Sequence, residues 1–534
     1  MRQLPGRPAL DERVLVVGAG PVGSVLALEL ARHGVGSTVV DRSTAAPAFP
    51  KMDYLNGRTM ELLRRLGLAD EVRRGGVDTR LRSDFIWTDT LTRPPIATWH
   101  YPAPDTLAGE LGEVDDGSAP LEVYQRIPGS LLENLLRRRL REHPLVDLRE
   151  GWTFTDLDER PSGVVASLVA RDGGARHTLH ARYLAGCDGA NSVVRQCRGI
   201  PMPAAGPVTS RCSVYFTSAD PLLRRHGRAF VTVGAKGITL VSRDEEDTWT
   251  ASFQVPTDEP FVGDPVEVMH DMLGAEFTVD EVMGVGQWQG SLAVASRYRV
   301  GPVFLAGDAA HQFYPFGGHG ANTGIADAVD LGWKLAGAVH GWGGDRLLDS
   351  YEAERRPVAL FNREMSADLL EVWGRFVRLA ADGASRGHIG GFLDRESHQL
   401  DNLGVHFGYR YTSSPVVVHE PGPAPRWDWH RIEPTTWPGG RAPSVRLSSG
   451  TALFDRFGTG FTLVDLTGTG AGEVAVKEAL GQGIPMERLA VDEAAVRAVW
   501  ERDLVLVRPD QHVAWRGDTV PDDWSAVLDV VCGR

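Results

Sequence analysis

The sequence is poor in several features that define other classes of protein. It has only four cysteines, Cys187, Cys197, Cys212 and Cys532, which form neither a CxxC pair nor a cluster with metal-ligand spacing. We therefore expect reduced thiols and no metal site. No apolar run approaches the length of a membrane span, so no membrane partner is expected. Residues 1–12 lack the apolar core of a signal peptide, which makes the cytoplasm the expected compartment.

Positive charge is also scarce. The 534 residues include 56 Lys and Arg against 70 Asp and Glu, a net charge of −14. This balance argues against a nucleic-acid partner, whose phosphates would be repelled. The hydrophobic fraction of 42% is typical of a globular protein. The length favours about two to four domains.

A strand, a glycine-rich turn and a helix begin the recognisable pattern. The run RVLVV at 13–17 precedes GAGPVG, and the helical SVLALELARHG leads to a second strand, STVVDR. In this GxGxxG turn, Gly18 makes the tight turn, Gly20 lets the backbone approach a pyrophosphate, and Gly23 lets helix and strand pack closely. Asp41 ends the second strand, where a carboxylate suits ribose hydroxyls. This unit predicts a bound dinucleotide, either FAD or NAD.

Two later segments distinguish between these cofactors. CDGANS occupies 187–192 after the strand YLAG, and VFLAGDAAH occupies 303–311. With these three motifs in this order, residues 10–380 resemble the class A flavoprotein aromatic hydroxylases, which share the fold of p-hydroxybenzoate hydroxylase. The resemblance implies tightly bound FAD. It also implies an α/β fold, in which a Rossmann-type FAD-binding domain carries an inserted antiparallel-sheet substrate domain.

The resemblance assigns roles to individual residues. Asp308 would contact the ribityl chain of FAD, and the helix beginning at Ala321 and Asn322 would point its N-terminus at the flavin. Arg58 and Gln125 match residues set beside the cofactor, although a solvated helix charge and a loop amide are the alternatives. Asp188 lies near the cofactor in the family, or simply caps a helix. The predicted FAD site comprises Gly18, Gly20, Pro21, Val22, Gly23, Asp41, Arg42, Arg58, Gln125, Asp188, Gly307, Asp308, Pro315, Gly318, Gly320, Ala321 and Asn322.

Aromatic residues mark the expected substrate side. The inserted sheet should form the far wall of the pocket, and the Gly-rich loop departs from the family pattern at its substrate face. Ordinary core packing is the alternative for each aromatic side chain. The candidate substrate residues are Tyr215, Phe230, Phe253, Trp288, Phe316 and His319.

The expected domains follow from these motifs. The C-terminal part resembles the thioredoxin-like domain of phenol and polyketide hydroxylases but has no CxxC, which argues against a redox role. We assign 1–80, 121–208 and 291–400 to the FAD-binding domain, 81–120 and 209–290 to the substrate domain, 401–443 to a linker and 444–534 to the thioredoxin-like domain.

The resemblance also implies the reaction. NADPH or NADH would bind transiently, because no second glycine-rich turn is present. The reduced flavin would then form a C4a-hydroperoxide with O2 and hydroxylate an aromatic substrate. An Ala/Gly/Arg-rich composition and the C-terminal segment favour a polycyclic polyketide. Baeyer–Villiger insertion, oxidative rearrangement, antibiotic inactivation and a non-catalytic flavoprotein are the alternatives. No catalytic base is identified, and a monomer or homodimer is expected.

Overall fold

A six-stranded sheet contains the glycine-rich turn. The computed structural model describes residues 13–49, 51–257, 259–400 and 402–534. The strand order is β18 (Arg299–Val300), β19 (Val303–Leu305), β11 (Tyr183–Gly186), β1 (Val14–Val17), β2 (Ser37–Asp41) and β7 (Val146–Glu150). All neighbours are parallel except β18, and the valine-rich β1 is wholly buried, as expected for a strand covered on both faces.

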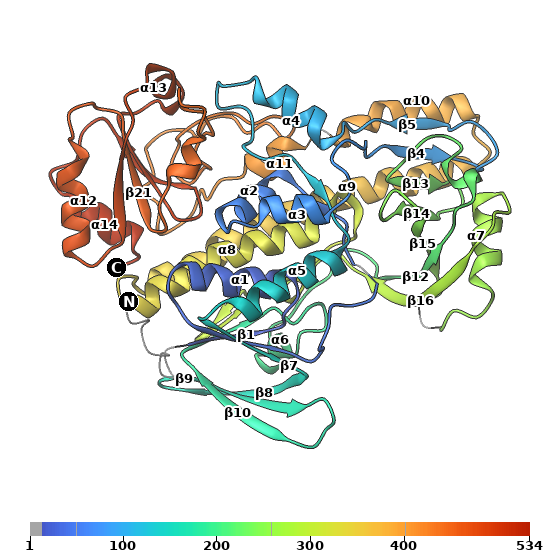
Figure 1. The fold of residues 1–534 in the computed structure, drawn as a ribbon, viewed down its shortest axis with the longest axis horizontal. Coiled ribbons are helices and arrows are strands. Elements are labelled where there is room, and N and C mark those ends of the chain that lie inside the picture. The colour runs from blue at the N-terminus through green and yellow to red at the C-terminus, as the bar shows by residue number, and fades with distance from the viewer. Residues whose placement is uncertain (1–12, 50, 258, 401) are drawn as a thin grey trace.

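Helices cover one face of this sheet. There α1 (Pro21–Arg32) packs between α5 (Gly129–Glu142) and α8 (His319–His340) (Figure 1). A separate antiparallel sheet of β8 (Trp152–Arg160), β9 (Gly163–Ala170) and β10 (Arg176–Ala181) projects at the bottom of the view. Short elements complete this part: β3 (Tyr54–Leu55), α2 (Gly57–Arg65), α3 (Ala69–Gly75), β6 (Gln125–Arg126), α6 (Val193–Cys197), β17 (Ala293–Val294) and β20 (His311–Gln312).

A seven-stranded sheet combines two separate stretches of the chain. Its order is β16 (Glu281–Gly290), β12 (Thr209–Thr217), β15 (Thr248–Val255), β14 (Thr239–Ser242), β13 (Val231–Gly234), β4 (Phe85–Thr88) and β5 (Ala97–Trp99). The sheet is antiparallel, as predicted, except that β13 and β4 are parallel. No hairpin joins these two strands, so nothing forces them to run in opposite directions.

Helices lie on both sides of this second sheet. Helix α7 (Pro265–Leu273) packs on one face, while α9 (Asp345–Ala381) and α10 (Arg386–Glu396) share an aromatic core with β4 and β13 on the other. Helix α4 (Pro104–Gly112) lies outside the sheet, nearer the C-terminal domain (Figure 1).

The predicted linker is packed rather than extended. Its residues from 402 onward include the short α11 (Leu403–Phe407), and Tyr411, Val416 and Thr436 are buried. Residue 401 lies outside the described residues. The segment therefore fills space between domains.

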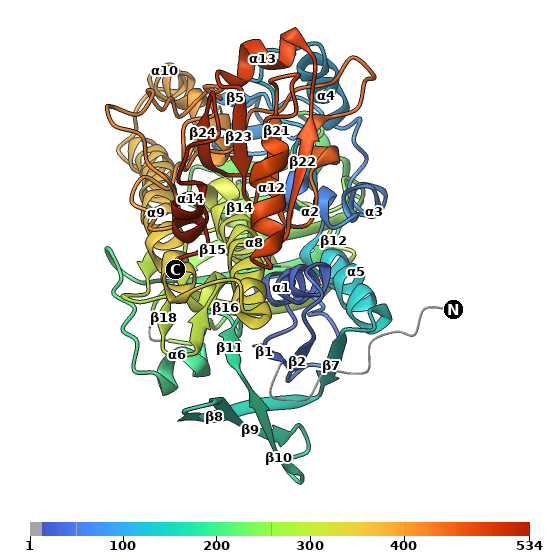
Figure 2. The same ribbon diagram turned by 90° about the vertical axis from the view of Figure 1, so that its left-hand side faces the viewer.

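The C-terminal domain is a four-stranded sheet with helices. Its order is β22 (Met486–Ala490), β21 (Phe461–Asp465), β23 (Leu504–Val507) and β24 (Val513–Gly517), of which only β21 and β22 are parallel. Helices α12 (Gly472–Gly481), α13 (Ala494–Trp500) and α14 (Trp524–Val531) accompany it (Figure 2). The likeness to thioredoxin stays a prediction. Across the described ranges, no helix combines the length and apolarity needed to cross a membrane.

Candidate active site

The first glycine-rich turn forms a cradle, which is an open space in front of the backbone at Gly20. A Cβ on Gly18, whose φ is +107°, would lie 2.3 Å from the Cys187 carbonyl oxygen, and one on Gly23 would lie 2.0 Å from the Gly18 carbonyl oxygen. A Cβ on Gly20 would meet nothing within 4 Å. Gly20 precedes α1 as its N-cap, and Pro21 and Val22 follow it. No side chain of the described residues caps the first backbone N–H groups of α1. Open space in front of a helix N-terminus fits the FAD pyrophosphate.

Asp41 joins the two strand ends beside this cradle. Its carboxylate accepts hydrogen bonds from the backbone N–H groups of Ala19 (2.7 Å) and Ser43 (2.7 Å), and Arg137 lies 3.3 Å away. These contacts hold the carboxylate at the turn and leave lone pairs for ribose hydroxyls. The neighbouring Arg42 is exposed.

Helix α8 anchors the GD segment, which is the turn of Gly307 and Asp308 within VFLAGDAAH. Asp327 accepts hydrogen bonds from the Gly307 N–H (3.3 Å) and from His311 Nε2 (2.8 Å), and it is itself paired with Arg355. Asp308 is exposed, and its carboxylate has no hydrogen-bond partner among the described residues. A free carboxylate at the end of β19 fits the hydroxyl-rich ribityl chain.

The loop from Pro315 to α8 is shaped by two left-handed glycines, Gly317 and Gly318, with φ of 77° and 66°. A Cβ on Gly318 would lie 2.8 Å from the ring of Tyr54, whereas one on Gly320, next to Ala321, would meet nothing within 4 Å. Asn322 does not offer its amide to a ligand: Nδ2 donates to the carbonyls of Gly318 and Tyr54, and Oδ1 accepts from the Asn56 N–H. The backbone at Gly320 is open and could lie against the flat flavin ring. Tyr54 has no motif around it and was missed by the sequence interpretation.

Asp188 caps helix α6, which was the alternative to a position near the cofactor. Its Oδ2 accepts from the backbone N–H groups of Val193 (2.7 Å) and Val194 (3.1 Å) at the start of α6. Its Oδ1 is buried and has no partner among the described residues. Burial accordingly raises the pKa of this carboxyl.

Arg58 and Gln125 contact protein groups outside the glycine-rich turn. Arg58 donates to Glu61, to the side chain of Gln511 (2.5 Å) and to the carbonyl of Asp510 (2.8 Å), so it fastens α2 to the C-terminal domain. Gln125 donates through Nε2 to the carbonyls of Val77 (2.9 Å) and Arg126 (2.8 Å) and closes a backbone turn. Other residues thus engage most polar atoms of both side chains, although the buried Nε of Arg58 has no partner among the described residues. Their assignment to the cofactor stays a prediction.

Three of the six predicted substrate residues are in a hydrophobic core or away from the sheet face. Phe253 lies opposite Cys212 on the α7 face, where both are fully buried. Phe316 packs on Trp373 with ring centroids 4.1 Å apart. His319 is buried beside His406, and burial lowers its pKa to about 4. Strand alternation explains Phe253, since successive residues point to opposite faces.

The other three lie at the opposite sheet face. Trp288 donates from Nε1 to Ser213 Oγ (2.9 Å), Tyr215 stacks on Phe49 with centroids 4.3 Å apart, and Phe230 lies under Arg126 at 4.0 Å. All three are partly exposed. The sequence interpretation missed the polar residues of this face, Arg211, Ser213 and Arg243. For Arg211 and Ser213, alternation with Cys212 and Val214 was a usable signal.

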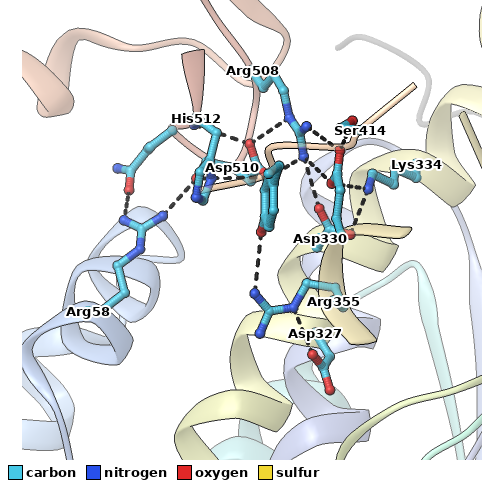
Figure 3. Close-up of polar contacts among 12 residues, drawn as sticks. Arg58, Asp327, Asp330, Lys334, Arg355, Ser414, Arg508, Asp510 and His512 are labelled. Atoms are coloured by element: carbon cyan, nitrogen blue, oxygen red, sulfur yellow. Dashed lines mark hydrogen bonds and ion pairs between the residues drawn. The ribbon is translucent and has the colours of Figure 1, made fainter. Parts of the chain in front are cut away.

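A buried charge network connects helices α8 and α9 to the C-terminal domain (Figure 3). Arg508 donates to Glu354 (2.7 Å), Asp330 (3.0 Å) and Asp510 (2.6 Å), and Lys334 lies 2.7 Å from Asp330. Oxygens of the three carboxylates lie within 4.8 Å of one another, close enough for a metal ion. Arg508 and Lys334 already neutralise these carboxylates. Because Arg508 belongs to the C-terminal domain and Lys334 to α8, we interpret the cluster as a junction between domains.

Comparison with known proteins identifies the family. The FAD binding domain family matches residues 11–363, and the aromatic-ring hydroxylase C-terminal family matches 435–534. The chain is 34% identical to the FAD-dependent monooxygenase apdD of Emericella nidulans, covering 97% of this chain and 89% of that protein. It is 32% identical to aklavinone 12-hydroxylase RdmE of Streptomyces purpurascens, with 98% of each covered. A solved structure of RebC with bound 7-carboxy-K252c matches with a TM-score of 0.86 and 31% identity, covering 98% of this chain and 99% of RebC. The cradle at Gly20, the free Asp308 and these matches along the whole chain lead to one conclusion: the chain belongs to the FAD-dependent aromatic-ring hydroxylases and is a monooxygenase.

Proposed function

We propose that this monooxygenase hydroxylates a small polycyclic aromatic compound of the polyketide type, at the expense of NADPH or NADH and O2. The observation that carries the proposal is the sheet face of Tyr215 and Trp288, which offers partly exposed aromatic surface. A Cβ on Gly286, on the same face, would meet nothing within 4 Å, so there is open space between them. The name of the relative RdmE, an aklavinone hydroxylase, supports this substrate class.

The residues of the chain bind, orient and shield. FAD, when bound, supplies electron transfer and oxygen activation. Gly20 and the start of α1 would hold its pyrophosphate, Asp41 its ribose and Asp308 its ribityl chain. The open backbone at Gly320 would lie against the flavin ring. The sheet face would hold the substrate ring and exclude water, which favours oxygen transfer over side reactions.

The test is a turnover assay under 18O2. The FAD-loaded enzyme is given NADPH or NADH and a panel of hydroxyanthraquinones, including emodin. We expect substrate-stimulated coenzyme oxidation and a product that carries one labelled oxygen. Because ring hydroxylation and Baeyer–Villiger insertion add the same mass, NMR connectivity of the product separates them. Coenzyme oxidation that no aromatic compound stimulates, with no labelled product, would refute the proposal.

A further inference from the structure

Arg211 lies on the substrate face and has no acidic partner among the residues that the structure describes. In β12 the side chains of Cys212, Val214 and Phe216 pack in the core beneath α7. Alternation along the strand therefore places Arg211, like Ser213 and Tyr215, on the opposite face. Arg211 lies directly across from Trp288 in the β12–β16 pairing.

The contacts of Arg211 use only part of its guanidinium. Nε donates to Ser252 Oγ (3.1 Å) and Nη2 to the Ser252 carbonyl (2.8 Å). Both N–H groups of Nη1 and the second of Nη2 have no hydrogen-bond acceptor among the described residues. The Ser252 contacts anchor the guanidinium along its Nε–Nη2 edge. The opposite edge, between Nη1 and Nη2, stays available and suits a carboxylate bound through both oxygens.

Two other arginines of this region, unlike Arg211, are paired with carboxylates. Arg126 is paired with Glu245, and Arg243 with Asp53. No carboxylate of the described residues lies within 4.0 Å of Arg211, although it is partly buried. Burial lowers its pKa to about 10, so it remains a cation at neutral pH without a counter-charge. A charge removed from water without a partner is costly and is retained where a ligand supplies the partner.

The surroundings of Arg211 are those of the substrate space. Ser213, two residues along, binds Trp288, and Thr209, two residues before, hydrogen-bonds Tyr314 at 2.7 Å. Tyr314 immediately precedes the Pro315 loop that leads to Gly320. Arg211 thus lies between the aromatic sheet face and that loop.

We propose that Arg211 binds a carboxylate carried by the aromatic substrate and thereby selects acidic polycyclic compounds over neutral ones. This inference rests on the proposed function, since it names the chemical class of the same substrate.

Two probes that differ at one substituent test it. Emodin carries a methyl group where emodic acid carries a carboxylate. Isothermal titration of the FAD-loaded enzyme at pH 8 should show emodic acid binding at least about tenfold more tightly than emodin, the size expected of a charge-assisted hydrogen-bonded pair. Arg211→Met should bring the ratio of the two affinities to about one and leave emodin binding within about twofold. Arg211→Lys keeps the positive charge but loses the two parallel N–H donors of the guanidinium. It should retain part of the preference for emodic acid over emodin.

Arg225 provides the matched control. It is exposed in the same domain, two residues after Leu223, which packs in the core on the α7 side. Arg225→Met removes the same charge and should leave the ratio unchanged.

The outcomes separate the two proposals. Equal binding of both probes to the wild-type enzyme, or an unchanged ratio in Arg211→Met, would overturn the role of Arg211 while leaving the proposed function intact. If neither probe binds, the proposed polycyclic substrate class is wrong, and this inference fails with it. FAD content confirms that each variant is folded, and Arg211→Gln replaces Arg211→Met if that variant loses FAD.

Discussion

Two glycines of the same turn exclude a side chain for different reasons. Gly18 is restricted by the protein itself, since its φ is left-handed and a Cβ would collide with the Cys187 carbonyl. Gly20 has an extended conformation, with φ of −68° and ψ of 179°, that any residue adopts, and its Cβ would enter open space. The first glycine serves the fold, and the second serves the ligand.

This difference can be measured with two alanine substitutions. Gly20→Ala should leave the unfolding free energy of the FAD-free protein within about 0.5 kcal/mol of wild type. It should weaken FAD binding at least about tenfold, because the methyl group occupies the space that the pyrophosphate needs. Gly18→Ala should destabilise the FAD-free protein itself by about 1–3 kcal/mol. Denaturant unfolding and FAD titration give the two readouts, and equal effects of both substitutions on stability would contradict this assignment.

At the scale of elements, α8 sets the position of the GD turn. Its Asp327 is fully buried and contacts the Gly307 N–H, His311 and Arg355. Burial alone would raise the pKa of Asp327, but Arg355 and His311 outweigh it and lower that pKa. Arg355 also reaches the hydroxyl of Tyr411, so the same helix pair supports the packed segment before the C-terminal domain.

Asp327→Asn should therefore affect both folding and cofactor retention. The amide keeps the shape but not the charge, which leaves Arg355 buried without a counter-ion and lowers the unfolding free energy of the FAD-free protein by about 3 kcal/mol. FAD binding should weaken as well, because the GD turn loses its anchor. Asp308→Asn is the control, since the exposed Asp308 should affect FAD binding alone. A variant Asp327→Asn with wild-type stability would show that α8 does not hold the turn.

For the whole molecule, buried charge joins the C-terminal domain to the rest. Arg508 comes after β23 and contacts Asp330 of α8 and Glu354 of α9. Burial opposes ionisation of Glu354, but Arg508 and Lys334 outweigh it and bring its pKa down to about 2. Ionised Glu354 therefore stabilises the folded protein at neutral pH, and that contribution is lost as pH falls from the ordinary value of 4.5 through 2. Asp330 in the same network behaves oppositely, because burial raises its pKa.

Arg508→Met removes one positive charge from this junction and leaves three carboxylates around Lys334. We expect a loss of about 3–5 kcal/mol at pH 8. Without Arg508 the folded-state pKa values of the carboxylates rise above those of the unfolded chain, so their destabilising effect appears above the unfolded-state pKa and diminishes as pH falls. Unfolding curves at pH 8 and pH 5 should show a smaller deficit at pH 5. A deficit that grows in acid would contradict this account.

Much of the cofactor half could be predicted from the chain because its determinants are local. A β-branched run, three glycines and a helix form one βαβ unit whose geometry depends on neighbours in sequence, and the GD segment likewise follows its own strand. The fold class and the monooxygenase activity followed from these motifs in order and were confirmed by the family matches. The cradle around Gly20 and the exposed Asp308 agree with the same local pattern.

Only the tertiary structure decided which way the remaining side chains face. Arg58 has its partners at Asp510 and Gln511, more than 450 positions away, and no local pattern specifies such a contact. Phe253 and Tyr215 both lie in strands rich in apolar residues, and the packing of α7 on one face determined which of them is buried. That no described carboxylate lies near Arg211 is also a property of the assembled sheet. Sequence determined the cofactor through local backbone geometry, whereas the substrate side depends on long-range packing that only the folded chain brings together.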